Sequence, residues 1–318
     1  MKTRLAFMIC IAAMTVSLTA AGERLTVMTY NVGLLRAFGS DYVAAVEARA
    51  KQAPAVIAAF AAASSPDIML LEEIWEDGFT GAISNALAPL GYTSVTPRVR
   101  SIIGLSSGLM LFVKTPLKII DWKFSPFTKT TFIDSFAKKG VLEADLKNTV
   151  TGTEFFIVGT HTLALDTTNG APSDKGQLDA FTVQASDILS AVRRRSTHGK
   201  PGLLIGDFNV GPGYADSAYR LIAGTDGFIE AGSAVIPGEA FTTWDPQNPL
   251  IAYGKYPNEP PAKIDHIFLV NAGRWKAHHA RTTMRDAIDG AQLTNNGRVI
   301  PLPLSDHYGF LAVITIEK

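Results

Sequence analysis

Several short apolar segments of this chain each end in a polar side chain, and this repeated arrangement constrains the fold most strongly. The segments 25–32, 67–74, 154–160 and 203–209 have the length and composition of buried strands. The polar residues at their ends are Asn31, Glu73, His161, and Asp207 with Asn209. Because ligand and catalytic groups gather at strand ends, we expect these side chains to share one site.

The segment 203–209 reads Leu-Leu-Ile-Gly-Asp-Phe-Asn and carries the most specific of these signals. Gly206 marks the point where the backbone leaves the strand. Strand alternation places Asp207 and Asn209 on the same face. A carboxylate and a carboxamide together can orient a nucleophile and hold an oxyanion or a hard cation. Alone, such a pair is usually a turn signal, so its interpretation depends on its neighbours.

The order of helical and strand patterns predicts an α/β fold with mixed parallel and antiparallel sheets and flanking helices. An Ala-rich helix, interrupted or restarted at Pro54, lies between two strands at the start of the chain. Short antiparallel strands fill the middle. The expected helices are 41–63, 174–195 and 215–223, and the other expected strands are 109–113, 117–122, 139–146, 264–270 and 310–316.

The first 22 residues have the layout of a secretory signal peptide. Lys2 and Arg4 precede the apolar run 5–18, and small residues follow at 19–22. An uncleaved membrane anchor is the alternative, although the run is short for a span. We therefore expect a secreted or periplasmic protein whose residues 23–318 form one catalytic domain.

Charge and cysteine content narrow the classes of partner and of metal site. The chain has 29 basic and 29 acidic residues, which argues against a nucleic-acid binder without excluding a local basic cleft. The single cysteine, Cys10, lies in the signal run, so the mature chain would lack thiolate ligands. A metal ion must then be held by carboxylates, amides or imidazoles.

Two late segments add further polar groups, Asp265-His266 and Ser305-Asp306-His307. Oxygen donors of the kind that Mg²⁺ prefers are present at Glu73, Asp207, Asn209 and Asp306. His161 and His307 can supply hydrogen-bond donors or a base near neutral pH.

These motifs occur in the order found in the endonuclease/exonuclease/phosphatase superfamily, and from about residue 24 to 316 the chain resembles it. The matching segments are Tyr30-Asn31-Val32, Leu71-Glu72-Glu73-Ile74-Trp75, Gly159-Thr160-His161, Gly206-Asp207-Phe208-Asn209, Ile264-Asp265 and Ser305-Asp306-His307. The resemblance implies two mixed β-sheets packed face to face with helices outside, a four-layer sandwich. It also implies Mg²⁺-dependent hydrolysis of a phosphoester.

The resemblance also implies roles for individual residues. Glu73 is the expected principal Mg²⁺ ligand, with Asn31 beside it and Asp306 supporting the metal side. His307 is the expected general base, and Asp265 holds its imidazole in the required tautomer. Asp207 is expected to position the attacking water. Asn209 and His161 are expected to donate to the phosphoryl oxygens.

The segment from Asp134 to Gly140 gives the best indication of the substrate, because it resembles the neutral sphingomyelinases. In their lipid-activated members an aspartate five residues before a lysine completes a switch, and Asp134 and Lys139 have that spacing. Lys138 stands where the family has a serine or alanine, which leaves the subfamily open. An ordinary basic turn into a strand is the alternative.

We therefore predict a secreted, Mg²⁺-dependent phosphodiesterase that hydrolyses sphingomyelin to ceramide and phosphocholine by in-line attack of activated water. Its partner would be phospholipid at a membrane surface, with aromatic and lysine residues at 122–127 and 253–256 suited to that interface. No obligate protein partner is expected, and other divalent cations are compatible. The alternatives are a secreted nuclease, a phosphoinositide phosphatase, and a binding or toxin module without turnover.

Overall fold

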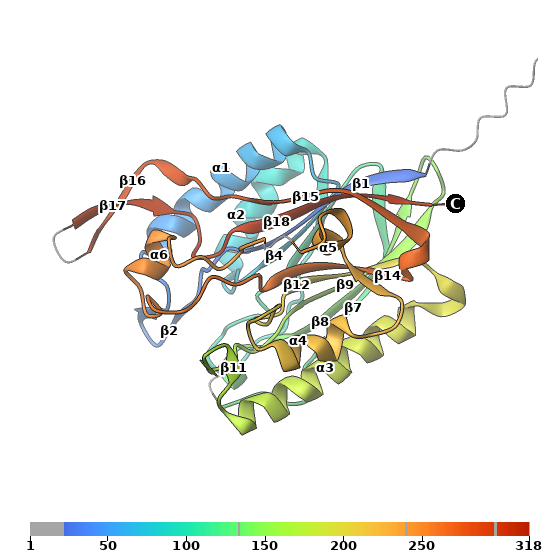
Figure 1. Cartoon of the computed structure of the whole chain (residues 1–318). Helices are drawn as coiled ribbons and strands as arrows, with labels where there is room; N and C mark the ends of the chain where they lie inside the picture. The colour runs from blue at the N-terminus through green and yellow to red at the C-terminus, as the bar shows by residue number, and fades with distance from the viewer. Residues whose placement is uncertain (1–21, 133, 239–240, 296–297, 318) are drawn as a thin grey trace, which may run out of the picture.

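The alternation of apolar residues along the strands builds two sheets that face each other. The computed structural model describes residues 22–132, 134–238, 241–295 and 298–317. Each main sheet has six strands and contains one parallel pair, β1 with β4 and β12 with β9, among antiparallel neighbours. The predicted architecture of two mixed sheets with helices outside is confirmed (Figure 1).

The sheets and hairpins have the following bounds. The first sheet has the order β15 (Trp275–Thr283), β18 (Gly309–Ile316), β1 (Glu23–Asn31), β4 (Ile68–Glu72), β6 (Met110–Lys114), β5 (Tyr92–Val95). The second has the order β13 (Phe228–Glu230), β14 (Asp265–Val270), β12 (Gly202–Asp207), β9 (Glu154–His161), β8 (Gly140–Asn148), β7 (Leu117–Pro126). Three small hairpins pair β2 (Arg36–Ala37) with β3 (Ser40–Asp41), β10 (Thr167–Thr168) with β11 (Ala171–Pro172), and β16 (Ala287–Asn295) with β17 (Arg298–Pro303).

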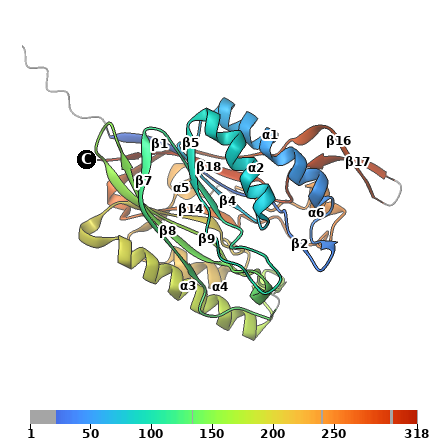
Figure 2. The same cartoon turned by 180° about the vertical axis from the view of Figure 1, so that it is seen from behind.

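Helices cover the outer face of each sheet, as Figure 1 and the view from behind in Figure 2 both show. Helices α1 (Val46–Ser64) and α2 (Asp77–Leu87) lie on the first sheet, and α3 (Lys175–Arg195) and α4 (Asp216–Ala223) lie on the second. The short helices are α5 (Ala231–Val235) and α6 (Pro249–Ala252). In the part of the chain that the structure describes, no helix is long and apolar enough to cross a membrane.

The core divides into three apolar layers because each strand presents alternate residues to opposite faces. In β1, Val27 packs between the sheets, whereas Met28 and Tyr30 pack under α1 and α2. In β12, Leu203 and Ile205 face the other sheet, and Leu204 packs under α3. Burying both faces of both sheets explains the continuous apolar runs in the sequence.

Glycines let β12 approach β9 closely enough to form the central parallel pair. A Cβ at Gly206 would lie 1.9 Å from the Thr160 carbonyl oxygen, and Gly206 has φ 146°. A Cβ at Gly202 would lie 2.1 Å from the Phe156 ring. Both positions therefore require glycine, and Gly206 sits one residue before the site residue Asp207.

The structure corrects two of the sequence predictions for helix α1. The helix begins at Val46 rather than near residue 41, and Pro54 lies inside it without interrupting it. Proline removes one intrahelical hydrogen bond. The helix tolerates this loss because its face with Ala50, Ala53 and Ile57 is buried against the first sheet.

Several elements were not predicted, and their sequences explain why. Helix α2 contains Gly78 and Gly81, which lower its helix propensity. Strand β15 lies at the edge of the first sheet and has the polar sequence Trp-Lys-Ala-His-His-Ala-Arg-Thr-Thr. Strands β5, β16 and β17 and helices α5 and α6 were also missed. The expected leader 1–22 falls, except for Gly22, outside the described residues.

Candidate active site

The site residues lie at one end of the space between the sheets, on the strand faces that point inward. Asp207 pairs with His161 on one side and with Asp265 on the other, so three strands bring these residues into one row. On the opposite sheet, Asn31 and Glu72 pair at the ends of β1 and β4. The pleat that buries apolar side chains further along each strand therefore points these polar ones at each other.

A hydrogen bond between Asn31 and Asp207 joins the two sheets at the site. The Asn31 amide donates to Asp207 Oδ2 at 2.9 Å and to Glu73 Oε1 at 3.1 Å. Its own Oδ1 accepts from the Gly33 N–H at 2.9 Å. Asn31 is 1% exposed. Its position is thus fixed by three contacts, as expected for a residue beside a metal ligand.

His307 and Asp265 form the pair that the sequence predicted. His307 Nδ1 lies 3.0 Å from Asp265 Oδ2, which fixes Nε2 as the nitrogen that faces the site. Nε2 lies 3.8 Å from Asp207 Oδ2. The Trp244 ring packs against the imidazole at a centroid distance of 5.1 Å. Ser305 Oγ accepts from the His307 N–H at 3.1 Å and donates to the Asn31 carbonyl at 2.7 Å.

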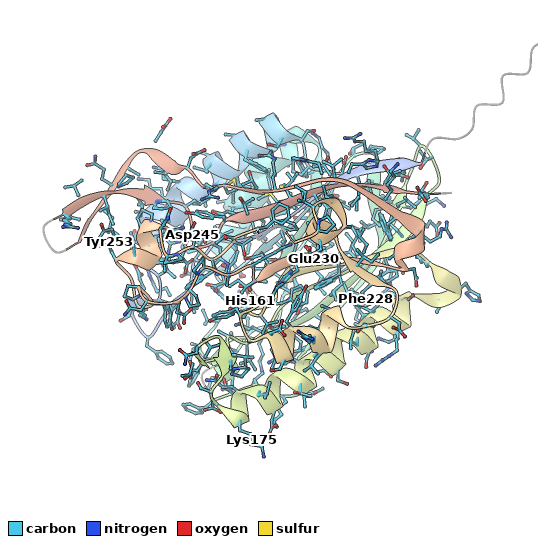
Figure 3. All side chains as sticks on the ribbon, in the orientation of Figure 1. His161, Lys175, Phe228, Glu230, Asp245 and Tyr253 are labelled. Atoms are coloured by element: carbon cyan, nitrogen blue, oxygen red, sulfur yellow. The ribbon has the colours of Figure 1, made fainter. Side chains whose placement is uncertain are left out.

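His161 lies between the two sheets at the end of β9 (Figure 3). Its Nε2 is 3.5 Å from Asp207 Oδ2 and 3.8 Å from Glu73 Oε1. Burial, with the nearby charges of Lys139 and His307, lowers the pKa of His161 well below its usual range. A neutral imidazole can donate one hydrogen bond, and Nε2 is the ring nitrogen that faces the site.

Asn209 reaches the site differently from the way alternation predicts. Strand β12 ends at Asp207, and Asn209 takes a left-handed conformation with φ 52° in the following turn. Its backbone N–H donates to Asp207 Oδ1 at 2.8 Å, and its side-chain amide donates to the Thr162 carbonyl at 3.1 Å. The turn, rather than the strand face, therefore places Asn209 beside Asp207.

Glu73 also lies beyond the end of its strand. Its φ is 58°, so the chain turns there and the side chain differs in direction from that of Glu72. Glu72 is fully buried and accepts a hydrogen bond from Thr29 at 2.5 Å. Burial and the nearby Asp306 raise the pKa of Glu73. Glu73 Oε2 is buried and has no hydrogen-bond partner, as is also true of Glu72 Oε2 and Asp265 Oδ1, so a carboxylate oxygen is available here to bind a cation.

A second grouping of possible metal ligands lies within the same site. One ligand atom each from Asp207, Asp265 and His307 lie within 4.8 Å of one another. These three residues were predicted as catalytic groups, and Glu73, Asn31 and Asp306 as the metal set. Both sets border the same space, because Asn31 and His161 contact Glu73 and Asp207 alike. The donors are carboxylate, amide and imidazole groups, as the absence of thiolates required.

Lys139 and Asp134 are brought together as their spacing suggested. Lys139 Nζ lies 3.2 Å from Asp134 Oδ1 and donates to the Thr162 carbonyl at 2.9 Å. Thr162 follows His161 directly, so the lysine lies at the edge of the site. Lys139 is 8% exposed.

Sequence reasoning missed Arg49, which is completely buried in α1. Its guanidinium donates to five backbone carbonyls, those of Val32, Gly33, Val43, Ala44 and Leu304. These carbonyls belong to the turn after β1, to the residues just before α1 and to the residue before Ser305. Arg49 therefore ties together two loops that carry site residues. A helical arginine is usually solvent-exposed, so nothing in the local sequence indicated this role.

His266 is fully buried, and its Nε2 contacts the Val210 carbonyl at 2.9 Å, which is a structural role.

Beside the site, a cavity of about 260 Å³ is lined by residues that include Asp306, Tyr42, Trp244 and Tyr256. The site thus has space for a ligand on the Asp306 side.

Burial and the neighbouring carboxylates shift the pKa values of both Asp207 and His307. Burial and the neighbouring Asp265 raise the pKa of Asp207 to about 7. Burial disfavours the His307 imidazolium, but Asp265 and Asp207 outweigh it and raise the pKa of His307 well above its usual range. Both groups therefore hold protons more tightly in the folded than in the unfolded chain.

This proton binding predicts how stability depends on pH in metal-free protein. Because folded Asp207 keeps its proton to about pH 7 and an unfolded aspartate loses it near 3.8, stability falls as the pH rises between these values. Asp207→Asn should flatten this fall, whereas the exposed-site control Asp226→Asn should keep the wild-type slope. Urea unfolding from pH 4 to 8 in the presence of a chelator measures the free energy of unfolding of the wild type and of each variant. If this free energy falls equally steeply with pH in the wild type and in Asp207→Asn, the raised pKa does not belong to Asp207.

Comparison with known protein families identifies the family of this chain. The model of the Endonuclease/Exonuclease/phosphatase family matches residues 28–307. No curated protein matches the sequence.

Solved structures share the fold at low sequence identity. Sphingomyelinase C from Streptomyces griseocarneus has 20% identity and a TM-score of 0.67, covering 91% of this chain and 99% of that one. A Bacteroides thetaiotaomicron protein of the endonuclease/exonuclease/phosphatase family has 18% identity and a TM-score of 0.67, covering 93% and 99%. D. rerio TDP2, complexed with a single-strand DNA product, has 17% identity and a TM-score of 0.65, covering 92% and 99%. Together with the family match over most of its length, the site establishes that this chain belongs to the endonuclease/exonuclease/phosphatase family.

Proposed function

We propose that this protein is a secreted or periplasmic Mg²⁺-dependent phosphodiesterase that hydrolyses sphingomyelin to ceramide and phosphocholine. The observation that carries the proposal is the buried His307–Asp265 pair, which faces Asp207, Asn31 and Glu73 across the ends of two sheets. A base, an orienting carboxylate and a partnerless carboxylate oxygen are what metal-assisted hydrolysis of a phosphodiester requires.

Each residue of the site has a separate role in the proposed in-line hydrolysis. His307 Nε2 accepts the proton of the attacking water while Asp265 holds the ring through Nδ1. Asp207, 3.8 Å from that nitrogen, helps to position the water. Neutral His161 and the Asn209 amide donate to the phosphoryl oxygens, where negative charge develops.

A divalent cation bound at Glu73, with Asn31 beside it and Asp306 in support, would neutralise charge on the phosphate and on the carboxylates. We propose Mg²⁺ because the available donors there are oxygens, with an amide and no thiolate. The partnerless Glu73 Oε2 supports this choice of ligand. Nearby positive charge would also bring the pKa of His307 back toward neutrality, which a general base requires.

Two observations and one expectation from the sequence support a choline phospholipid as substrate. The Asp134–Lys139 ion pair forms at the edge of the site, as the resemblance to neutral sphingomyelinases implied. The fold is shared with a bacterial sphingomyelinase C. The expected leader 1–22 would export the enzyme to where it meets membrane lipid.

A nuclease is the second candidate, because the fold is equally shared with TDP2 bound to DNA product. A balanced charge of 29 basic and 29 acidic residues favours it less, since DNA binding requires phosphate-neutralising cations. Binding to a lipid surface with zwitterionic head groups does not require such an excess of cationic side chains.

A substrate panel distinguishes the two candidates. Purified protein is incubated with sphingomyelin, phosphatidylcholine and single-stranded DNA, each with Mg²⁺ and with a chelator. We expect phosphocholine release from sphingomyelin that requires Mg²⁺. Cleavage of DNA without release from either lipid would overturn the lipid assignment, and no chelator-sensitive hydrolysis at all would overturn the enzyme assignment.

Lys139 tests the lipid-specific part of the proposal. Lys139→Ala removes the ion pair with Asp134 and the bond to the Thr162 carbonyl. We expect hydrolysis of sphingomyelin vesicles to fall by about tenfold or more, the scale of one lost charged hydrogen bond, and hydrolysis of a small soluble phosphodiester to fall less. The surface variant Lys147→Ala, which removes a pair with Glu154 at the surface, is the control. An equal loss with both substrates would refute a lipid-specific role.

A further inference from the structure

Three phenylalanines from two distant segments form an exposed aromatic patch, defined as Phe38, Phe132 and Phe136. The ring centroids of Phe38 and Phe136 are 5.1 Å apart, and those of Phe132 and Phe136 are 5.2 Å apart, both edge-to-face. Phe38 is 73% exposed and Phe132 is 80% exposed. Rings so exposed bury little area in the fold, so folding alone does not account for them.

The backbone conformation at Phe38 is a second indication that folding alone does not account for its exposed ring. Phe38 and Gly39 form the two-residue turn between β2 and β3, with φ 52° and 75°. Such a turn favours Asn-Gly, because both positions need positive φ. A bulky aromatic residue there is strained, and its ring projects from the tip of the hairpin. A strained, exposed residue indicates a role outside the fold.

The patch adjoins the Asp134–Lys139 ion pair at the edge of the candidate site. Asp134 stands between Phe132 and Phe136 in sequence and pairs with Lys139 at 3.2 Å. Lys139 contacts the Thr162 carbonyl, next to His161. The β2–β3 hairpin follows Asn31 closely in sequence, and Figures 1 and 2 both place it at the end of the molecule opposite the C-terminus.

The charges around the patch fit a phospholipid surface. The segments 34–44 and 127–139 hold four basic residues and two acidic ones. The acidic ones are both paired, Asp41 with Arg36 at 3.0 Å and Asp134 with Lys139. These pairs occupy two of the basic residues, and Lys129 and Lys138 lie outside them. Aromatic rings at turn tips with basic residues beside them suit the lipid–water interface, where rings enter the acyl boundary and cations meet phosphates.

We propose that the aromatic patch docks the protein on the surface of a phospholipid bilayer and presents the site to lipid there. This deepens the proposed function by naming the docking surface. It also revises one of the two segments expected from the sequence to form that interface, 122–127. Tyr256, from the other expected segment 253–256, contacts the Tyr42 hydroxyl at 2.5 Å, just after the β2–β3 hairpin. Trp122 lies within β7, paired with Ala144 away from the strand ends, so the expected segment 122–127 does not supply the patch.

The test measures binding to vesicles separately from catalysis. Vesicles of phosphatidylcholine and sphingomyelin are sedimented with the protein in a chelator, so that lipid is not consumed. The double variant Phe38→Asn, Phe132→Ser removes two rings and leaves the catalytic groups in place. Asparagine suits the positive φ at position 38, so the variant should fold and melt no lower than the wild type. The control is Val150→Ser, an 81% exposed apolar residue in the turn between β8 and β9.

We expect the double variant to bind vesicles at least about tenfold more weakly, since two rings no longer leave water. Val150→Ser should bind like the wild type, and both variants should hydrolyse a soluble phosphodiester like the wild type. Undiminished vesicle binding by the double variant would overturn the proposal. A wild-type protein that does not bind vesicles would also overturn it and favour a protein partner for the patch. If vesicle binding depends on the patch but no phosphodiester is hydrolysed, the docking surface stands and the proposed function fails.

Discussion

The concentration of carboxylates at one end of the inter-sheet core is the constraint on which the rest of the site depends. Glu72, Glu73, Asp207, Asp265 and Asp306 lie close enough together for their charges to interact, and all are largely withdrawn from water. Burial, together with the charge of neighbouring carboxylates, raises the pKa of Glu72, Glu73 and Asp207. The fold holds this arrangement with His307 beside two of the carboxylates, Lys139 at the edge and Asn31 donating to two of them. Glu73 Oε2, Glu72 Oε2 and Asp265 Oδ1 have no hydrogen-bond partner, and the divalent cation that we propose at Glu73 would offset the negative charge of the cluster.

The scaffold keeps these groups in place through backbone contacts more than through side chains of the site. Glycine at 202 and 206 lets β12 and β9 lie close, which aligns Asp207 with His161. The Arg49 guanidinium gathers the carbonyls of Val32, Gly33 and Leu304, so that the loop after β1 and the loop with Asp306 share one anchor. A cation that satisfies several carbonyls at once fixes loops that would otherwise have no regular hydrogen bonds.

Much of this arrangement could be predicted from the sequence, because inward-facing strands combine apolar runs with a polar end. Asn31, His161 and Asp207 were located in this way, and each ends a strand. Glu73 and Asn209 also lie beside these residues, but positive φ in the turns sets the direction of their side chains, and strand alternation carries no information on it. Arg49 and the phenylalanines of the patch could not be found, since their contacts join residues far apart in sequence. Edge strand β15 and Gly-containing α2 were missed because tertiary packing outweighs weak local propensity.

We propose that His307, oriented by Asp265, is the general base of a metal-dependent phosphodiesterase. The most direct measurement is the turnover of His307→Ala on a soluble phosphodiester with Mg²⁺, together with its unfolding curve and its Mg²⁺ affinity by calorimetry. We expect the turnover of His307→Ala to be lower than that of the wild type by about a hundredfold or more, while its folding and its Mg²⁺ affinity stay close to wild type. Turnover near the wild-type rate would contradict it, and a loss of Mg²⁺ affinity equal to the loss of turnover would make His307 a metal ligand instead.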